Sequence, residues 1–309
     1  MLGCTSTETE KKSQEAGDEQ ELQGPFLVVL GTVQDAGSPH LNCKKECCAE
    51  LLKNPDPSRK VVSLAVVDPD NEKKYLFEAS PDIRSQLASL NELDGFESND
   101  FPDAIFITHA HIGHYTGLMY LGRESANADS VPVYTMPRMK SFIENNGPWS
   151  QLVNLGNIVP KTLDTSRNIQ IGSVTVECFL VPHRDEYSET VGFRIKGPNK
   201  SVLFIPDIDK WHKWDKNIIE YISSVDYAFL DATFYDGEEI RQRDISEIPH
   251  PFVIESMALF DGLPDAEKQK IHFIHLNHTN PLLNSDSEQH KRVISKKYNI
   301  SSYLDRVQL

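Results

Sequence analysis

Residues 104–114 read AIFITHAHIGH, an apolar segment that runs directly into a cluster of histidines. Its apolar part has the composition of a buried strand. His109 and His111 lie two positions apart at the end of that strand, so an extended backbone points both imidazoles to the same side. His114 follows in a loop and can return to the same cavity. Neutral imidazole is a common ligand for Zn²⁺ and also suits iron or manganese, so the segment predicts a metal site.

A purely structural role is the alternative for this cluster. It would bury several polar rings within a few residues, and each ring would need its own hydrogen-bond partner. Metal binding satisfies the ring nitrogens together, and we therefore favour it.

From Pro25 onward the chain alternates between predicted strands and predicted helices. The predicted strands are residues 26–34, 61–68, 74–79, 103–111, 131–136, 169–183, 189–197, 200–209, 226–234 and 270–278. The predicted helices are residues 80–90, 116–124, 137–146, 211–224 and 251–260. No linker rich in Pro, Gly or Ser divides the two strand-rich halves, so we expect one domain over residues 25–309.

The chain resembles the metallo-β-lactamase superfamily. Its members carry His-x-His-x-Asp-His after an apolar strand, and then a lone His, an Asp and a final His, each at the end of a later strand. The corresponding residues here are His109, His111, His114, His183, Asp207 and His275. The resemblance covers nearly all of residues 25–309 and implies an α/β (α+β) fold, the four-layer αββα sandwich of that superfamily.

Within the superfamily, the chain is similar to the pyrroloquinoline quinone biosynthesis protein B family and to the cyclic phosphodiesterase of the carbon–phosphorus lyase pathway. The segments that carry this similarity are VLGTVQDAGSPHLNC (29–43), HIGHYTGLMYLGRE (111–124), DATF (231–234) and IHLNHTNPLL (274–283).

One departure from the superfamily pattern concerns the metal count, because Gly113 stands where the pattern has Asp. The resemblance implies an intact first site of His109, His111 and His183. The second site would contain His114, Asp207 and His275 without its usual carboxylate. We therefore expect one tightly held ion and a second that is weak or absent. Zn²⁺ is the first choice, and iron is the alternative.

The resemblance implies a metal-dependent hydrolase that uses metal-bound hydroxide on an ester-like or phosphodiester bond. Asp207 would orient the water or bridge two ions. His250, in EIPHPF, corresponds to a late histidine that protonates a leaving group in related phosphodiesterases. Asp231, in LDATF, is a candidate to orient a ligating histidine. Residues 184–186 follow His183 directly and are candidates to line the pocket, or simply a solvated charged turn.

Two other functions are compatible with the sequence. An iron-loaded site would favour an oxidative role related to quinone-cofactor biosynthesis, and activity with iron but not with zinc would indicate it. Loss of the Asp at position 113 is also compatible with a non-catalytic binding or sensor protein.

Three cysteines, Cys43, Cys47 and Cys48, lie within six residues. This spacing is poor for a disulfide framework and better for a metal site. A structural Zn²⁺ needs four ligands, and the resemblance to the phosphodiesterase points to His278 as the fourth. His40 could replace one of the cysteines. Free or oxidised thiols in a loop are the alternative, and Cys178 is expected in the core.

The N-terminus predicts a lipid anchor. Leu-Gly-Cys at residues 2–4 is similar to the end of a bacterial lipoprotein signal, which makes Cys4 the expected lipidation site. The polar residues 5–23 cannot fold alone, so residues 1–24 would form an anchor and disordered tether, with the domain in the bacterial periplasm. A chance tripeptide is the alternative, with a cytoplasmic location.

Composition limits the partners. The chain has 46 acidic and 31 basic residues and a formal net charge of −15. Since phosphate-backbone binding needs concentrated Lys and Arg, we expect a small-molecule substrate and no nucleic acid. The sequence has no run of 18 apolar residues, so membrane contact is expected only through the N-terminal lipid.

Overall fold

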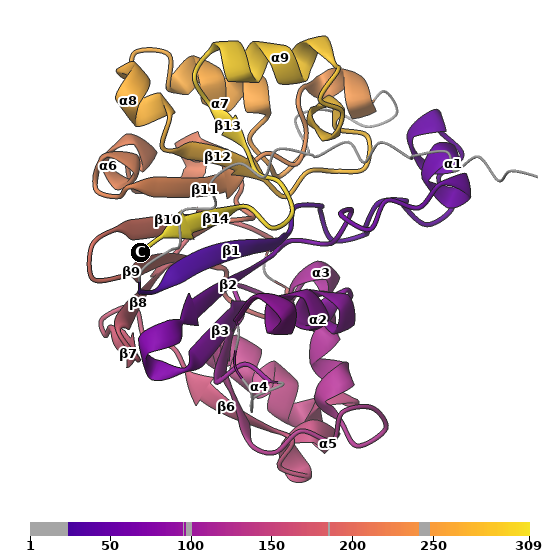
Figure 1. Cartoon of the computed structure of the whole chain (residues 1–309), viewed down its shortest axis with the longest axis vertical. Coiled ribbons are helices and arrows are strands. Elements are labelled where there is room, and N and C mark those ends of the chain that lie inside the picture. The colour runs from indigo at the N-terminus through magenta and orange to yellow at the C-terminus, as the bar shows by residue number, and fades with distance from the viewer. Residues whose placement is uncertain (1–23, 95, 97–100, 185, 241–247) are drawn as a thin grey trace, which may run out of the picture.

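The computed structural model describes residues 24–94, 96, 101–184, 186–240 and 248–309. These residues form two seven-stranded sheets that pack against each other, with helices on the outer faces (Figure 1). The fold is the expected αββα sandwich. Cys4 and residues 5–23 lie outside the described residues, as does Asp185.

The first sheet comes mainly from the N-terminal half of the chain, with one edge strand from the C-terminus. Its strands, in spatial order, are β14 (Arg306–Gln308), β1 (Phe26–Gly31), β2 (Ser63–Asp68), β3 (Lys73–Phe77), β4 (Ala104–Phe106), β5 (Val131–Thr135) and β6 (Ile158–Thr162). The strands of the second sheet, also in spatial order, are β13 (Asn299–Ile300), β12 (Ile271–Ile274), β11 (Tyr227–Asp231), β10 (Ser201–Ile205), β9 (Val191–Lys196), β8 (Val174–Leu180) and β7 (Ile169–Ile171).

Helices cover the outer face of each sheet (Figure 1). The α-helices are α1 (Glu46–Lys53), α2 (Ile83–Asp94), α3 (Ile112–Tyr115), α4 (Pro137–Asn145), α5 (Trp149–Asn154), α6 (Ile218–Ser223), α7 (Val253–Leu259), α8 (Asp265–Lys268) and α9 (Glu288–Ser295). The 3₁₀ turns are η1 (Pro69–Asn71), η2 (Thr116–Leu121), η3 (Trp211–Lys213), η4 (Gly237–Ile240) and η6 (Pro281–Leu283). None of the helices in these ranges is long and apolar enough to cross a membrane.

Most central strands are buried on both faces, which explains their nearly continuous apolar sequences. In β1, Leu27 and Val29 face the space between the sheets, whereas Val28 and Leu30 pack under the helices. Aromatic rings from both sheets meet in the middle: Phe106 of β4 lies 5.9 Å from Phe193 of β9, ring centroid to centroid. This packing holds the strand ends of the two sheets in fixed positions relative to each other.

The structure differs from the predicted elements mainly at turns. Residues 169–183 form two strands rather than one, since Gly172 adopts a left-handed conformation (φ +52°) that turns β7 into β8. The helix expected over residues 211–224 is divided into the 3₁₀ turn η3 and the helix α6, and the Asn217 side chain caps α6 by accepting the Ile219 N–H. Residues 116–121 form a 3₁₀ turn. The elements α1, α5, α8, α9, β6, β13 and β14 were not predicted, nor was α3, which contains His114 where a loop was expected.

Candidate metal centre

The six histidine and aspartate residues named from the sequence come together where strands of both sheets end. His109 and His111 follow β4, His183 follows β8, Asp207 follows β10 and His275 follows β12. His114 lies in the short helix α3. The sandwich therefore brings residues up to 166 positions apart, 109 to 275, to one edge.

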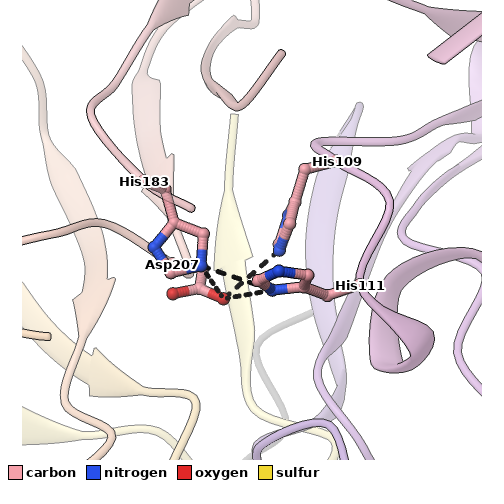
Figure 2. Close-up of side chains that lie close together, drawn as sticks. All are labelled: His109, His111, His183 and Asp207. Atoms are coloured by element: carbon pink, nitrogen blue, oxygen red, sulfur yellow. Dashed lines mark hydrogen bonds and ion pairs between the residues drawn. The ribbon is translucent and has the colours of Figure 1, made fainter. Parts of the chain in front are cut away.

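The first ligand group contains His109, His111, His183 and Asp207, with one ligand atom from each within 4.8 Å of all the others. Figure 2 shows the three rings directed toward the Asp207 carboxylate. The Oδ2 atom of Asp207 lies 3.3 Å from Nε2 of His109, 3.7 Å from Nδ1 of His111 and 3.2 Å from Nε2 of His183. Three imidazoles and one carboxylate form a donor set suited to Zn²⁺.

The hydrogen bonding of this group indicates that the residues present fit a cation. The Nε2 atom of His109 is buried and has no hydrogen-bond partner, although a carboxylate oxygen is 3.3 Å away. Burial and the neighbouring His114 lower the pKa of His109 well below its usual range, so the ring is neutral and has a free lone pair. Burial alone would raise the pKa of Asp207, but His183 and His250 hold it well below its usual range. A lone pair and a buried anion that face one another favour a positive ion.

A second group shares Asp207 with the first and contains His114, His275 and Asp35. The superfamily motif predicts the first two residues but not Asp35, so a carboxylate besides Asp207 lies in this group although Gly113 supplies none. The Oδ1 atom of Asp35 lies 2.9 Å from Nε2 of His114 and 3.4 Å from Nε2 of His275. The available indication was an acidic residue just after the first strand, inside the segment GTVQDAGSPH.

Neighbouring oxygens orient the histidine rings from behind, an arrangement common around metal ligands. The contacts are Thr108 Oγ1 to His109 Nδ1 (2.9 Å), Thr233 Oγ1 to His275 Nδ1 (2.8 Å) and Glu78 Oε2 to His114 Nδ1 (3.4 Å). The Thr233 hydroxyl donates to Asp231 (2.7 Å), so its oxygen receives the proton of His275 Nδ1. This leaves the lone pair of His275 Nε2 facing Asp35.

Two buried residues of the centre have strained backbones. His275 and Glu78 both lie in the left-handed region, at φ +65° and +74°, and neither is exposed. Such a conformation costs on the order of 1–3 kcal/mol for a residue with a side chain. Strain of this kind is characteristic of positions where the surrounding structure fixes a functional side chain.

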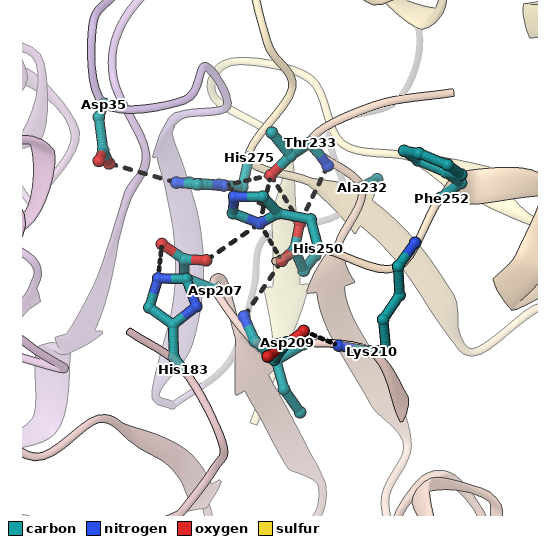
Figure 3. Close-up of polar contacts among 12 residues, drawn as sticks. Asp35, His183, Asp207, Asp209, Lys210, Ala232, Thr233, His250, Phe252 and His275 are labelled. Atoms are coloured by element: carbon teal, nitrogen blue, oxygen red, sulfur yellow. Dashed lines mark hydrogen bonds and ion pairs between the residues drawn. The ribbon is translucent and has the colours of Figure 1, made fainter. Parts of the chain in front are cut away.

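His250 lies beside Asp207 and Thr233 at the back of the same site (Figure 3), in contact with Asp231. The Nδ1 atom of His250 lies 2.9 Å from Oδ2 of Asp231 and 3.1 Å from Oδ1 of Asp207. Burial lowers the pKa of His250, but Asp231 and Asp207 outweigh it and raise the pKa to about 10. His250 is therefore a cation at neutral pH. Asp231 is 4.0 Å from His275 Nδ1 and acts on that ring through Thr233.

A cavity of about 240 Å³ opens beside the first group. Its lining residues are Gln34, Asp35, His111, His183, Arg184, Asp207, Thr233, Phe234, Ile248, Pro249 and His250. The guanidinium of Arg184 lies at its exposed side, with Nη2 3.3 Å from Nε2 of His111, and pairs with Glu186 at 3.2 Å. Arg184 therefore lines the pocket, which was one of the two possibilities given for residues 184–186; the other was a solvated charged turn.

The cysteine cluster lies on and before α1, with the sulfur atoms of Cys43, Cys47 and Cys48 within 4.8 Å of one another. Burial raises the pKa of the Cys48 thiol to about 12. Cys48 accepts a hydrogen bond from the His40 backbone N–H at 3.3 Å, and the His40 ring lies 4.4 Å from the ring of His278. His278 therefore lies near the cluster, although its ring nitrogens are not within 4.8 Å of all three sulfur atoms. Cys178 is buried in β8, as expected.

The profile of the β-lactamase superfamily domain matches residues 73–273, and the chain therefore belongs to this superfamily. Two relatives are similar over almost their whole length. Coenzyme PQQ synthesis protein B of Acinetobacter baylyi is 25% identical over 286 residues, covering 85% of this chain and 92% of the relative. The protein of the same name from Klebsiella pneumoniae is 24% identical over 304 residues, covering 89% and 96%.

Solved structures support the fold. The Zn²⁺-bound PqqB from Methylobacterium extorquens superimposes with a TM-score of 0.75 at 21% identity, covering 92% of this chain and 100% of that one. A diphosphatase from the PhnP family superimposes with a TM-score of 0.65, also at 21% identity, covering 93% and 97%.

Proposed function

We propose that this chain is a metal-dependent hydrolase that cleaves an ester-like or phosphodiester bond. The observation that carries this proposal is the first ligand group, in which three histidines surround a buried aspartate beside a cavity. The names of similar structures support it, since one is a Zn²⁺-bound PqqB and another a diphosphatase. Zn²⁺ is therefore the first choice of ion.

The residues that would hold the ion are His109, His111, His183 and Asp207. A divalent ion in such a site lowers the pKa of a coordinated water from about 15.7 to roughly 7 and polarises the substrate oxygen. Asp207 directs Oδ2 toward the three histidines and Oδ1 toward His250. It therefore links the ligand group to the residue that we propose as the proton donor.

His250 is placed to donate a proton to the leaving group. Its pKa, raised to about 10, keeps it protonated at neutral pH. Asp231 holds the Nδ1 side of the ring, and the ring lines the cavity, so the other nitrogen is the one available to substrate. A positioned general acid typically contributes about 10²–10⁴-fold to the rate.

The mouth of the cavity favours a small anionic substrate. Arg184 lines the cavity next to His111, and a guanidinium binds phosphate or carboxylate oxygens through two parallel hydrogen bonds. Glu186 competes for the same guanidinium at 3.2 Å, so an incoming anion would displace that carboxylate.

An oxidative, iron-dependent function is the second candidate. The similarity to coenzyme PQQ synthesis protein B favours it, and a site of histidines and a carboxylate also suits iron. The ion that supports turnover distinguishes the two functions, because hydrolysis proceeds with Zn²⁺ whereas redox chemistry does not.

We also propose that Cys43, Cys47 and Cys48 bind a structural Zn²⁺, with a fourth ligand from His278 or His40. Three sulfur atoms close together and the neighbouring imidazoles of His40 and His278 support the proposal, since thiolates and imidazoles are the usual ligands of such sites.

The experiment is metal loading followed by substrate screening. Metal-free protein is loaded separately with Zn²⁺, Mn²⁺ or Fe²⁺ and assayed on bis(p-nitrophenyl) phosphate, a lactone and a thioester. We expect turnover with Zn²⁺ or Mn²⁺, and His111→Ala should reduce it on the order of 1000-fold. His212→Ala, which removes an exposed histidine outside the centre, should behave as wild type. Activity with iron alone would support the oxidative function, and no turnover with any ion would support a binding protein.

A further inference from the structure

We propose that Asp35, on the loop after β1, supplies the carboxylate ligand that the superfamily motif places at position 113, and that it completes a second metal site with His114, His275 and Asp207. The inference rests on the proposed metal centre and adds a second ion to it. The sequence motif alone led to the opposite expectation, because Gly113 removes the usual carboxylate.

Positions 35 and 113 compete for the same space. A Cβ atom built on Gly113 would overlap the Asp35 carboxylate and lie 2.5 Å from the Asp35 Cα. Any side chain at position 113 would therefore displace Asp35. Asp35 can reach the histidines of this group only because residue 113 is a glycine. The group can therefore take a carboxylate from position 35 or from position 113, but not from both.

The backbone fixes the loop that carries Asp35. The N–H of Gln34 donates to the carbonyl of Leu276 at 2.9 Å, and the N–H of Leu276 donates to the carbonyl of Thr32 at 2.8 Å. Leu276 directly follows the ligand His275, so the two ligand-bearing segments are joined by main-chain hydrogen bonds. Asp35 is thereby positioned before any ion binds.

The Nε2 atoms of His114 and His275 both face Oδ1 of Asp35, at 2.9 and 3.4 Å. The Nε2 atom of His114 is fully buried and has no hydrogen-bond partner, although Oδ1 of Asp35 is 2.9 Å away. On the other side of the ring, Glu78 lies 3.4 Å from Nδ1. Figure 3 shows Asp35 directed at the edge of His275. A cation between Asp35 and the two rings would satisfy these atoms together.

Charge gives an independent reason for a cation. Asp207 and Glu78 are almost entirely buried and Asp35 is mostly buried, so three carboxylates lie in or beside this group. Burying several anions is costly unless cations accompany them. A salt bridge from a protonated His114 to Asp35 is the structural alternative. The two differ in the number of ions bound, which is measurable directly.

The test is the metal content of Asp35→Asn, which keeps the shape of the side chain and removes its charge. Metal-free protein is loaded with Mn²⁺, excess ion is removed, and bound metal is measured by mass spectrometry. The count excludes the cysteine cluster through a background in which Cys48 is replaced by Ser. We expect two ions in this background and one after Asp35→Asn. Glu186→Gln, which removes a carboxylate 3.8 Å from His111 Nε2, is the matched control and should keep two.

Electron paramagnetic resonance gives a second readout that does not depend on activity. Two Mn²⁺ ions that share the Asp207 carboxylate should give a spin-coupled spectrum, and Asp35→Asn should give the spectrum of an isolated ion. Gly113→Ala should have the same effect without removing a carboxylate, because its methyl group displaces Asp35. Thermal unfolding confirms that each variant is folded.

Three results would overturn the inference: two ions in Asp35→Asn, one ion in both that variant and its parent, or an unchanged coupled spectrum in Gly113→Ala. If the parent binds one ion, the first ligand group and the proposed hydrolase stand without the second site. If His111→Ala in the same background binds as much metal as the parent, the proposed function fails as well.

Discussion

The two ligand groups share Asp207 but come from the sequence in different ways. In the first, His109, His111 and His183 occupy the positions that the superfamily order predicts. In the second, the extra carboxylate comes from Asp35, far earlier in the chain than the histidine motif. The difference teaches that a candidate ligand set is defined by atoms that meet in space, whatever their order in the sequence. A motif with a gap is therefore not evidence of a missing ligand until the fold has been examined.

The largest loss of activity is expected from His111→Ala. This substitution removes a residue of the first ligand group and leaves Asp35, His114 and His275 of the second group unchanged. Loss of an ion that contributes several kcal/mol to transition-state stabilisation should reduce kcat/KM on the order of 1000-fold. Steady-state kinetics on the best substrate from the screen, with bound metal measured in parallel, checks this. If His111→Ala retained both its metal and full activity, His111 would not be a metal ligand.

Replacement of His250 by Gln separates proton donation from metal binding. We expect metal content to stay unchanged and kcat to fall about 100-fold, within the usual range for a general acid. The acid form exists below a pKa of about 10, so the wild-type rate should fall as pH rises through that value. The pH–rate profile checks the result: the variant should lack this high-pH limb. A variant that keeps the limb would assign it to another group.

Thr108 and Thr233 each contact a histidine of a different ligand group, so substitutions at these positions test the two groups separately. Thr233→Val removes the oxygen behind His275, and Thr108→Val removes the one behind His109. Each should weaken metal affinity about 10–100-fold, but for different ions. Competition with a chelator during metal titration measures the two affinities separately. If both variants weaken the same ion, the division into two groups is incorrect.

The smallest effect on activity is expected from the cysteine cluster. Cys48→Ser should lose the proposed structural Zn²⁺ and lower the Tm by a few degrees, while kcat stays close to wild type, since a site of this kind stabilises the fold. Differential scanning calorimetry with and without added Zn²⁺ measures this. An unchanged Tm and unchanged zinc content would favour free thiols instead.

The alternation of strands and helices and the pair His109 and His111 could be predicted from local patterns, whereas the αββα sandwich and the roles of His183 and Asp207 came from the resemblance to the superfamily. Apolar strands buried on both faces and histidines at a strand end can be recognised without knowing what lies opposite. Asp35 could not be recognised in this way, because its role depends on the space that Gly113 leaves open and on main-chain bonds to Leu276. Short elements such as β13 depend on tertiary pairing for the same reason.

Anomalous X-ray scattering from crystals of Zn²⁺-loaded protein tests the central claim most directly. A peak should lie about 2.0–2.1 Å from Nε2 of His109, Nδ1 of His111 and Nε2 of His183, the usual zinc–nitrogen distance. Crystals that bind zinc only at the cysteine cluster, with no peak among these rings, would contradict the account.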